Sequence, residues 1–337
     1  FPTRRSSDLV WVNTELLNLD NYRHRIYYGT STQEPDTLIQ AIEGAGKCTA
    51  YRDICYIVFE DFPLSDFGNR IPNFTFEIKR KELFDKNDEN LLENMITGVN
   101  LIPGSGEFSY DTKITDKVKN IIVNGYLYDD YEEKQTLNKN NNENVADCIL
   151  SLNQLQNDLP NCKWVAPVVG WFGSSLDIST CIIKPKIEYP EIDGHIFFKN
   201  TPNDWQVGNY TRKNANLVSS DNGSIRYGGT PSDSSVLNLM KNLKERNLKI
   251  MFYPMIFMDI ENKPWRGYLT GNCNNIENFY NNQYKPFILH YANLVKDYAD
   301  CFIIGSELKG LTSIKDENNN FPFVDKLIDL ANECRKD

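Results

Sequence analysis

The sequence is poor in the residues from which metal and nucleotide sites are built. It has three histidines, and none of its eight cysteines stands in a C-x-x-C pair. A zinc site needs clustered sulfur and imidazole ligands, so we expect no metal site and predict reduced, unpaired thiols. Gly228-Gly229 belongs to neither a G-x-G-x-x-G nor a G-x-x-x-x-G-K-[ST] motif. We therefore expect no nucleotide and no other cofactor.

Positive charge is also scarce. The chain has 36 Lys and Arg residues against 46 Asp and Glu residues, so its net charge is −10. This balance argues against nucleic-acid binding, which needs a basic face to neutralise phosphates, and against a polybasic membrane-binding surface. The longest nearly apolar stretch, 164–172, is about half a bilayer span, so we expect no membrane span. We also expect no signal peptide, because no secretory signal with an apolar segment is found.

The two ends of the chain differ from the sequence between them. Residues 1–9 read FPTRRSSDL, which looks like the in-frame translation of a sequencing-adapter oligonucleotide. We interpret this segment as an artefact and leave it out of the fold. At the other end, Asp337 falls in or just after a helical pattern. We therefore interpret both ends as cuts in a longer protein.

The 337 residues are 40% hydrophobic, enough for about two domains with packed cores. We expect residues 10–137 to form an α+β region that is rich in β-structure and irregular loops. β-branched, aromatic or alternating residues predict strands at 55–59, 74–78 and 120–128. A short helix is predicted at 36–43. The polar, Asn-rich run 138–145 is interpreted as the linker to a second domain.

After this run, strands alternate with longer helices. The predicted helices are 145–159, 230–247, 287–298 and 323–331, and the predicted strands are 164–172, 250–260 and 301–305. Thr230 is the expected N-cap of the second helix, with Pro231 in its first turn. The alternation predicts an α/β fold with a parallel sheet. Residues 174–229 interrupt it and are interpreted as an insertion.

One carboxylate stands where a functional group is expected in such a fold. In a parallel α/β barrel, functional side chains gather where strands end, and Glu307 follows the strand predicted at 301–305. A carboxylate in this position can act as a general acid or base. The alternatives are that Glu307 caps the next helix or pairs with Lys309.

A second group of residues has the composition of a sugar-binding site. Asp259 ends the strand predicted at 250–260, and Trp265 and Arg266 follow it. An aromatic ring can stack on sugar C–H groups while polar side chains bind the hydroxyls. Trp171, near the end of the strand at 164–172, could line the same opening at the carboxyl ends of the strands. The alternatives are that Trp265 packs on the rim and that Trp171 lies in the core.

Short motifs along the chain resemble one known family. The motifs are Tyr56-Ile-Val-Phe-Glu-Asp61, Phe67-Gly-Asn-Arg-Ile-Pro72, Tyr227-Gly-Gly-Thr-Pro-Ser-Asp233 and Ile304-Gly-Ser-Glu-Leu-Lys-Gly-Leu311. In order and spacing the chain, from about Ile26 onward, resembles the hub or baseplate proteins of phage tails and gene transfer agents. These proteins have a glycoside-hydrolase TIM-barrel-like domain. The resemblance implies a β-rich tail-hub region at 10–137 and the first half of such a barrel at 146–337.

The barrel part is similar to retaining (β/α)8 glycosidases, including some β-mannanases. The similarity implies that Glu307, after the fourth strand, is the acid/base residue and that Asp259, Trp265, Arg266 and Trp171 bind substrate. Retaining hydrolysis also needs a second carboxylate about 5–5.5 Å away. In such barrels it comes from a late strand, beyond residue 337, so we expect this fragment to be inactive alone.

The resemblance also implies a biological setting. The protein would be a structural baseplate or hub component whose barrel binds, and in complete form cleaves, a host cell-surface polysaccharide. Its partners would be other tail proteins, with copies of itself in a ring. Its place would be the virion or a phage-like tail particle, after synthesis in the bacterial cytoplasm. Two alternatives stay open: a cellular retaining glycoside hydrolase of the mannanase type, and a non-catalytic glycan-binding or structural barrel.

Overall fold

The computed structural model describes residues 9–12, 15–67, 69–77, 90–102, 106–123, 126–141, 143–190, 196–199 and 205–335. Of the segment interpreted as an artefact, residues 1–8 lie outside this description, and Leu9 begins the first strand. The chain divides into two compact units, Phe1–Leu83 and Phe84–Asp337. The division falls at residues 83 and 84, not at the Asn-rich run 138–145 where the linker was predicted.

The Asn-rich run packs into the second unit. The amide oxygen of Asn138 accepts a hydrogen bond from the backbone N–H of Thr115 at 2.7 Å, and its Nδ2 donates to the carbonyl of Lys113 at 2.8 Å. Asn138 is 5% exposed. A buried amide must find hydrogen-bond partners, and here it satisfies the backbone of a neighbouring segment. The Asn-rich run 138–145 is therefore a packed part of the second unit and not a linker between domains.

The first unit is built from two antiparallel pieces. β1 (Leu9–Val12) lies between β2 (Glu15–Leu16) and β5 (Phe74–Glu77), and β3 (His24–Tyr27) pairs with β4 (Tyr56–Phe59). The unit also contains η1 (Leu19–Asn21), α1 (Thr37–Glu43) and η2 (Leu64–Phe67). The strands predicted at 55–59 and 74–78 and the helix at 36–43 are present as β4, β5 and α1.

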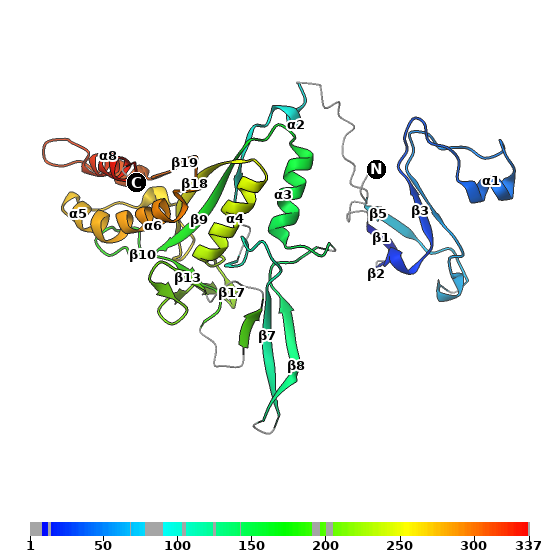
Figure 1. Cartoon of the computed structure of the whole chain (residues 1–337), viewed down its shortest axis with the longest axis horizontal. Helices are drawn as coiled ribbons and strands as arrows, with labels where there is room; N and C mark the ends of the chain where they lie inside the picture. Colours follow the sequence, from blue (N-terminus) through cyan, green and yellow to red (C-terminus); the bar gives the residue numbers. More distant parts are fainter. Residues whose placement is uncertain are drawn as a thin grey trace. The chain divides into compact units, whose positions relative to one another are not determined.

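The second unit is organised around a parallel sheet (Figure 1). Its strands lie in the order β6 (Gly98–Leu101), β9 (Trp164–Gly173), β18 (Lys249–Met258) and β19 (Cys301–Phe302), all parallel. β10 (Ile183–Lys184) adds a short antiparallel pair at the end of β9. These four parallel strands are neighbours in the sheet in the same order as in the sequence, and helices connect them. This arrangement is a partial TIM-barrel-like fold.

The first parallel strand is β6, which the sequence analysis placed in the β-rich region 10–137. β6 has only four residues, Gly98–Leu101, with alternating exposure, and this is too short to predict a sheet position. The strand predicted at 164–172 is therefore the second, and β19 is the fourth. Glu307 follows that fourth strand, as the resemblance implied.

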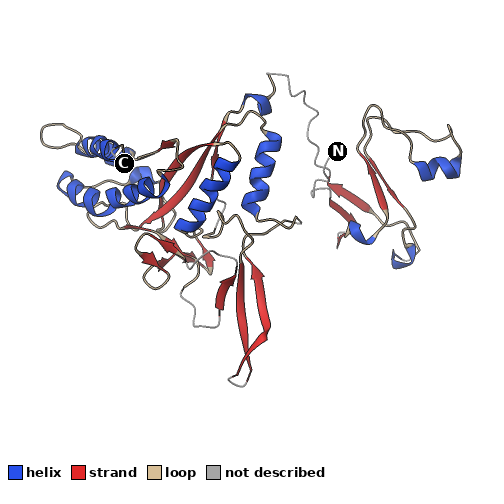
Figure 2. Cartoon of the chain, in the orientation of Figure 1, coloured by secondary structure: helices blue, strands red, loops and turns tan. Residues whose placement is uncertain are grey.

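Helices follow the sheet in the order that the sequence predicts. They are α2 (Leu92–Met95), α3 (Asp147–Asp158), α4 (Asp233–Glu245), η3 (Arg266–Tyr268), η4 (Cys273–Asn275), α5 (Ile276–Phe279), the π-helical turn η5 (Tyr280–Tyr284), α6 (Lys285–Val295), α7 (Lys309–Thr312) and α8 (Pro322–Cys334). The helices predicted at 145–159, 230–247, 287–298 and 323–331 are α3, α4, α6 and α8. Figure 2 shows α3 and α4 side by side, and Arg246 after α4 donates to Asn153 of α3 at 2.7 Å.

Side chains alternate between the two faces of the sheet, and on β18 the two faces differ in burial. One face packs under the helices and forms the main core with Val165, Val169, Trp171, Phe252 and Ile256, each at most 5% exposed. Full burial of one such side chain contributes roughly 1.5–3 kcal/mol. The opposite face carries Tyr253 and Phe257, which are only half-buried. On β9 the residues of this second face are buried as well, with Val168 fully buried and Phe172 3% exposed.

The start of α4 differs from the prediction by two residues. Ser232, not Thr230, is the N-cap, and its hydroxyl accepts from the N–H of Ser235 at 3.1 Å. Thr230 instead donates its hydroxyl to the carbonyl of Gly170 in β9 at 2.8 Å. The helix therefore begins later because Thr230 is used to fasten the preceding segment to the sheet.

The insertion 174–229 consists of short paired strands. They are β11 (Lys186–Ile187) with β15 (Asn216–Leu217), β13 (Gln206–Val207) with β14 (Tyr210–Thr211), and β16 (Ser220–Asp221) with β17 (Ser224–Ile225). A further strand, β12 (Ile196–Lys199), pairs with β7 (Asp116–Val123), which also pairs with β8 (Tyr126–Thr136). The strand predicted at 120–128 thus spans parts of two antiparallel strands rather than one.

Candidate functional site

Glu307 lies on the loop that leaves β19, at the carboxyl ends of the parallel strands. Its φ angle is +56°, a left-handed conformation that costs a non-glycine residue about 1–2 kcal/mol. The side chain is 48% exposed. Strained backbone at an exposed strand end is a common property of functional sites. The structure therefore places the predicted carboxylate where a ligand can reach it.

Trp265 and Arg266 bond directly to this carboxylate. The indole Nε1 donates to Glu307 Oε2 at 2.5 Å, and the Arg266 guanidinium lies 2.9 Å from the same oxygen. Trp265 is 40% exposed, whereas the Arg266 side chain is 11% exposed. Glu307 thus has Arg266 rather than Lys309 as its ion-pair partner. Within the described residues both bonds use Oε2, so Oε1 is available to a ligand.

Close backbone packing fixes this geometry. A Cβ on Gly310 would lie 2.4 Å from the carbonyl oxygen of Leu269, so only glycine lets α7 approach the segment after β18 this closely. Beside Glu307, the hydroxyl of Tyr253 donates to the hydroxyl of Ser306. The loops after β18 and β19 are therefore held against each other, and Glu307 is held against Trp265.

Asp259 is on the same rim but is closed off from solvent. Its side chain is fully buried, and Oδ2 accepts from Lys186 Nζ at 2.6 Å and from the N–H of Ser219 at 2.9 Å. Both partners belong to the insertion 174–229. Asp259 therefore ties the insertion to the end of β18 rather than facing a ligand, which differs from the substrate contact predicted for it.

Trp171 lies in the core instead of at the predicted mouth. It is 5% exposed, and its Nε1 donates to the hydroxyl of Tyr291 in α6 at 2.9 Å. Its ring also packs against Phe287, with centroids 5.1 Å apart. The reason is strand alternation, because Trp171 shares the helix-facing side of β9 with Val169.

We expect Tyr291→Phe to lower the free energy of unfolding by about 1–3 kcal/mol, because it leaves the buried Trp171 N–H without an acceptor. Chemical denaturation measures this change. Binding at the rim should not change, since both rings lie on the opposite face of the sheet. A loss of ligand binding at unchanged stability would contradict the core position of Trp171.

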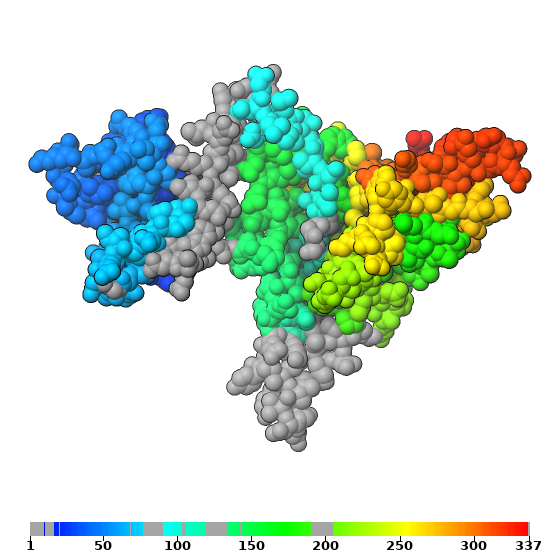
Figure 3. All heavy atoms as spheres, turned by 180° about the vertical axis from the view of Figure 1, so that it is seen from behind, coloured from blue at the N-terminus to red at the C-terminus, as the bar shows by residue number. Residues whose placement is uncertain are grey.

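A cleft of about 490 Å³ opens on the other face of the sheet. Its lining comes from the ends of β6, β9 and β18 and from the segment before α4, and includes Phe172, Arg226, Tyr227, Gly229 and Phe257. Figure 3 shows this side of the molecule, where the cyan segment around β6 and the light green and yellow segments around residues 225–270 adjoin. A volume of this size is typical of small-molecule sites.

One comparison with known proteins covers Glu307. Residues 282–337, from the end of η5 to the end of the chain, match the family model of the GTA TIM-barrel-like domain. The second unit carries a TIM-barrel-like domain. Two solved structures, titled "Complex structure of GH113 beta-1,4-mannanase" and "Structure of GH113 beta-1,4-mannanase", are 14% and 16% identical to the chain, with TM-scores of 0.34. Each match covers 56% of this chain and 46% of the other, so the chain spans about half their length. No curated protein sequence matches it.

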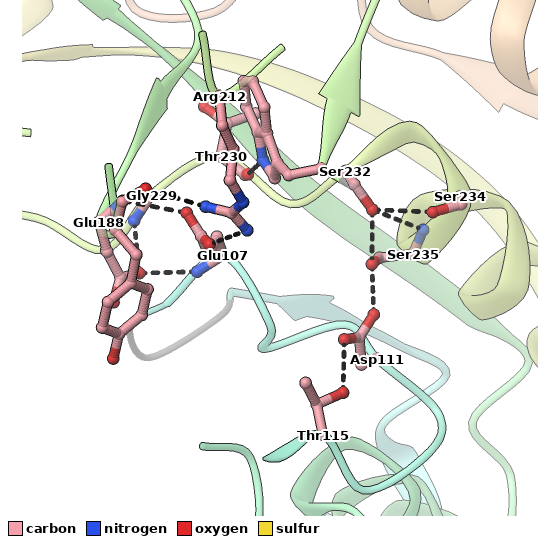
Figure 4. A network of polar contacts seen from close by, with 12 residues as sticks. Glu107, Asp111, Thr115, Glu188, Arg212, Gly229, Thr230, Ser232, Ser234 and Ser235 are labelled. Carbon is pink, nitrogen blue, oxygen red and sulfur yellow. Dashed lines mark hydrogen bonds and ion pairs between the residues drawn. The ribbon is translucent and has the colours of Figure 1, made fainter. Parts of the chain in front are cut away.

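A buried polar network stands beside the cleft of the TIM-barrel-like domain (Figure 4). Glu107, just after β6, accepts from Arg212 at 2.5 Å and from the N–H of Glu188 at 3.0 Å. Glu188 in turn accepts from the N–H groups of Glu107 and Gly229, both at 2.7 Å. Burial raises the pKa of Glu107 to about 7, against the opposing effect of Arg212. We call Glu107, Glu188 and Arg212 the clasp, because they join β6, the insertion and the cleft wall.

Sequence reasoning missed the clasp. Glu107 and Arg212 are 105 residues apart, and nothing in their local sequence pairs them.

The structure does not suggest a metal site either, since no group of three or more His, Cys, Asp or Glu residues in the described ranges could hold an ion. Across those same ranges, no helix has both the length and the apolar character required to cross a bilayer.

Proposed function

We propose that the TIM-barrel-like domain binds a cell-surface polysaccharide at the rim formed by Glu307, Trp265 and Arg266. The observation that carries this proposal is that two side chains, those of Trp265 and Arg266, bond directly to the exposed carboxylate of Glu307. The exposed indole offers a flat apolar surface for the C–H face of a sugar ring. Glu307 Oε1 and the guanidinium offer an acceptor and donors for hydroxyls.

The same arrangement suits acid/base chemistry on a glycosidic bond. Glu307 would give its proton to the leaving oxygen and then take one from water, as the acid/base residue of a retaining hydrolase does. The second carboxylate, at about 5–5.5 Å, would act as nucleophile. Within the described residues Glu307 is bonded to nitrogen atoms of Trp265 and Arg266 and not to a second carboxylate. Cleavage is therefore proposed only for a barrel that adds such a group.

We place this domain in a structural baseplate or hub component of a phage-like tail or a gene transfer agent. The motifs at 56–61 and 67–72, which prompted this resemblance, fall on β4 and around η2 in the first unit. That unit would contact other tail proteins and form a ring with its own copies. The particle would be assembled in the bacterial cytoplasm, and the barrel would meet polysaccharide on the host surface.

The test is binding to immobilised bacterial envelope polysaccharides. We expect Glu307→Gln to weaken binding by roughly 10–100-fold, because hydrogen bonds to a charged group contribute about 1.5–3 kcal/mol. Glu261→Gln is the matched control, since Glu261 is exposed on the loop before Trp265 and should bind normally. Equal binding by both variants would remove Glu307 from the site.

Turnover separates the alternatives. The assay measures the release of reducing ends by a chain that includes the later strands of the barrel. Release that is lost in Glu307→Gln would support a hydrolase, either in a phage-like tail or in a cell. Binding without turnover would support a non-catalytic glycan-binding barrel. If no polysaccharide binds, the proposed function is wrong and a purely structural barrel is left.

A further inference from the structure

The helix that precedes β19 contains a wide turn. Helices α5 and α6 are joined through the π-helical turn η5, where the N–H of Lys285 donates to the carbonyl of Tyr280, five residues earlier. Pro286 follows directly, and in a regular α-helix its ring would collide with the carbonyl four residues before it. A wider turn gives this ring room. Turns of this kind are frequent at functional sites, so we asked which side chains η5 places.

The wide turn brings Tyr284 to the end of β19. The Tyr284 hydroxyl donates to the carbonyl of Ile304 at 2.7 Å, and the residue is 2% exposed. Its ring packs against those of Phe287 and Phe323, with centroids 6.4 Å and 5.5 Å away. Burial raises the pKa of Tyr284, so the hydroxyl keeps its proton and stays a donor. The ring is held firmly, and its hydroxyl is fixed on the backbone of the next strand.

The bond to Ile304 falls where the chain leaves the sheet. The N–H of Ile303 still donates to the carbonyl of Phe252 in β18, at 3.0 Å. One residue later the carbonyl is bonded to a side chain of the helix layer, and Glu307 follows with its left-handed backbone. A carbonyl that leaves the sheet ladder needs another donor. Tyr284 supplies that donor at the point where the direction of the loop is set.

Gly305 allows this close approach. A Cβ on Gly305 would lie 2.8 Å from the Tyr284 hydroxyl oxygen. The next nearest atoms, Leu308 Cδ1 at 3.2 Å and Leu327 Cδ2 at 3.6 Å, are the ends of flexible side chains. The hydroxyl is therefore the main obstacle to a larger residue, and the glycine at position 305 is matched to the tyrosine at position 284.

The same loop is also held on its other side. The Tyr253 hydroxyl donates to the Ser306 hydroxyl from the face of the sheet opposite the helices. Tyr284 acts from the helix layer, on the residue two positions earlier in the loop. With both contacts present, Glu307 meets Trp265. Loss of the Tyr284 contact would leave the loop fixed on one side only.

We propose that Tyr284 is a positioning residue for Glu307, which through the carbonyl of Ile304 sets the loop that brings the carboxylate to Trp265. The inference rests on the proposed function of the Glu307 rim and adds to it a residue from the helix layer. Tyr284 acts through the backbone and does not touch the ligand.

The first test measures the contact between Glu307 and Trp265 without any ligand. The indole N–H NMR signal of Trp265 in the full chain is assigned by its loss in Trp265→Phe. Glu307→Gln removes the charge from this hydrogen bond and so gives the reference shift. We expect Tyr284→Phe to move the signal in the same direction as Glu307→Gln does, because the carboxylate recedes from the indole.

Tyr291→Phe is the matched control. It also removes one buried tyrosine hydroxyl from this helix, but that hydroxyl is bonded to Trp171 in the core. It should leave the Trp265 signal in place, and thermal unfolding compares the stability of the two variants. On immobilised envelope polysaccharide we expect Tyr284→Phe to bind about 10-fold more weakly than wild type, and Tyr291→Phe within about 2-fold.

A double variant tests the contact itself. Gly305→Ala should weaken binding by about 10-fold, because its methyl group displaces the Tyr284 hydroxyl. Added to Tyr284→Phe, it should cause less than about 2-fold further loss, since the main obstacle is gone. Effects that multiply in the double variant would show that the two positions act independently, which contradicts the proposal.

The outcomes separate this inference from the proposed function. If the wild-type chain binds no polysaccharide, the proposed function fails, and the Trp265 signal alone decides whether Tyr284 sets the position of Glu307. If Glu307→Gln weakens binding but Tyr284→Phe changes signal and binding no more than Tyr291→Phe does, the inference is wrong and the proposed function stands. A moved signal with wild-type binding would also overturn a role for Tyr284 in the site.

Discussion

Arg212→Met is expected to lower the free energy of unfolding by about 3–5 kcal/mol at pH 8.5, the usual effect of leaving a buried charge without its partner. Glu107 has no exposed side-chain surface and Arg212 only 11%, so water cannot replace the guanidinium. At pH 5.5 the effect should fall to roughly 1–2 kcal/mol, the value of the lost hydrogen bonds alone. Urea denaturation at the two pH values measures the difference.

The direction of this pH dependence follows from the raised pKa of Glu107, about 7 in the folded chain against an ordinary value near 4.5. A carboxyl whose pKa is raised by folding binds more protons in the folded state, so its contribution falls as pH rises from 4.5 through 7. Over that window the wild-type chain should lose about 3 kcal/mol from this group. Above pH 7 the Glu107 carboxylate is ionised, so its buried charge depends most on stabilisation by the Arg212 guanidinium.

Glu107→Gln supplies the control for the clasp. Its side chain keeps the shape of the protonated acid and cannot ionise. In this background Arg212→Met should have the same effect at pH 5.5 and pH 8.5. An unchanged pH dependence in Glu107→Gln, or an equal effect of Arg212→Met at both pH values in the wild-type background, would show that the clasp does not titrate.

The second large effect is expected at Gly310. In Gly310→Ala the new methyl group would lie 2.4 Å from the carbonyl of Leu269 and 2.9 Å from that of Gly267, and these backbone atoms cannot rotate away. Helix α7 must therefore shift, which separates Glu307 from Arg266. Displacement of about 1 Å in a site can reduce its activity 100-fold, and we expect polysaccharide binding to weaken by about this factor. Overpacking should also lower the free energy of unfolding by about 1–3 kcal/mol.

Lys309→Ala is the control for this prediction, because Lys309 is the exposed neighbour of Gly310 on the same short helix. It should leave both binding and stability close to wild type. If Gly310→Ala binds polysaccharide as well as Lys309→Ala does, then the contact between α7 and the segment after β18 does not position the site.

Long periodic segments of this chain could be predicted from the sequence, and short or polar ones could not. The strand at 164–172 is apolar over nine residues, and the helix before residue 247 has a regular apolar face; they are present as β9 and α4. β6 could not be recognised, since its four residues acquire their place only by pairing with β9. The domain boundary predicted at 138–145 was misplaced because Asn138 is a residue typical of polar loops, whereas in the structure its side chain is buried and hydrogen-bonded.

The candidate site was predicted in part because strand ends are visible in a sequence. This rule located Glu307, Trp265 and Arg266, which the structure brings together. It misplaced Trp171 because β9 is buried on both faces and shows no alternation from which the direction of a side chain could be read. Nor could it locate Tyr227, which lines the cleft from the insertion rather than from a strand.

The separation of Glu107 and Arg212 along the chain has a consequence for the order of folding. Closing a loop of 105 residues is entropically expensive, and such contacts form after local ones. The strands and helices from β9 onward can assemble before the clasp does. The wall of the cleft, which depends on Glu188 and Gly229, would then be among the last parts of the domain to reach its final shape.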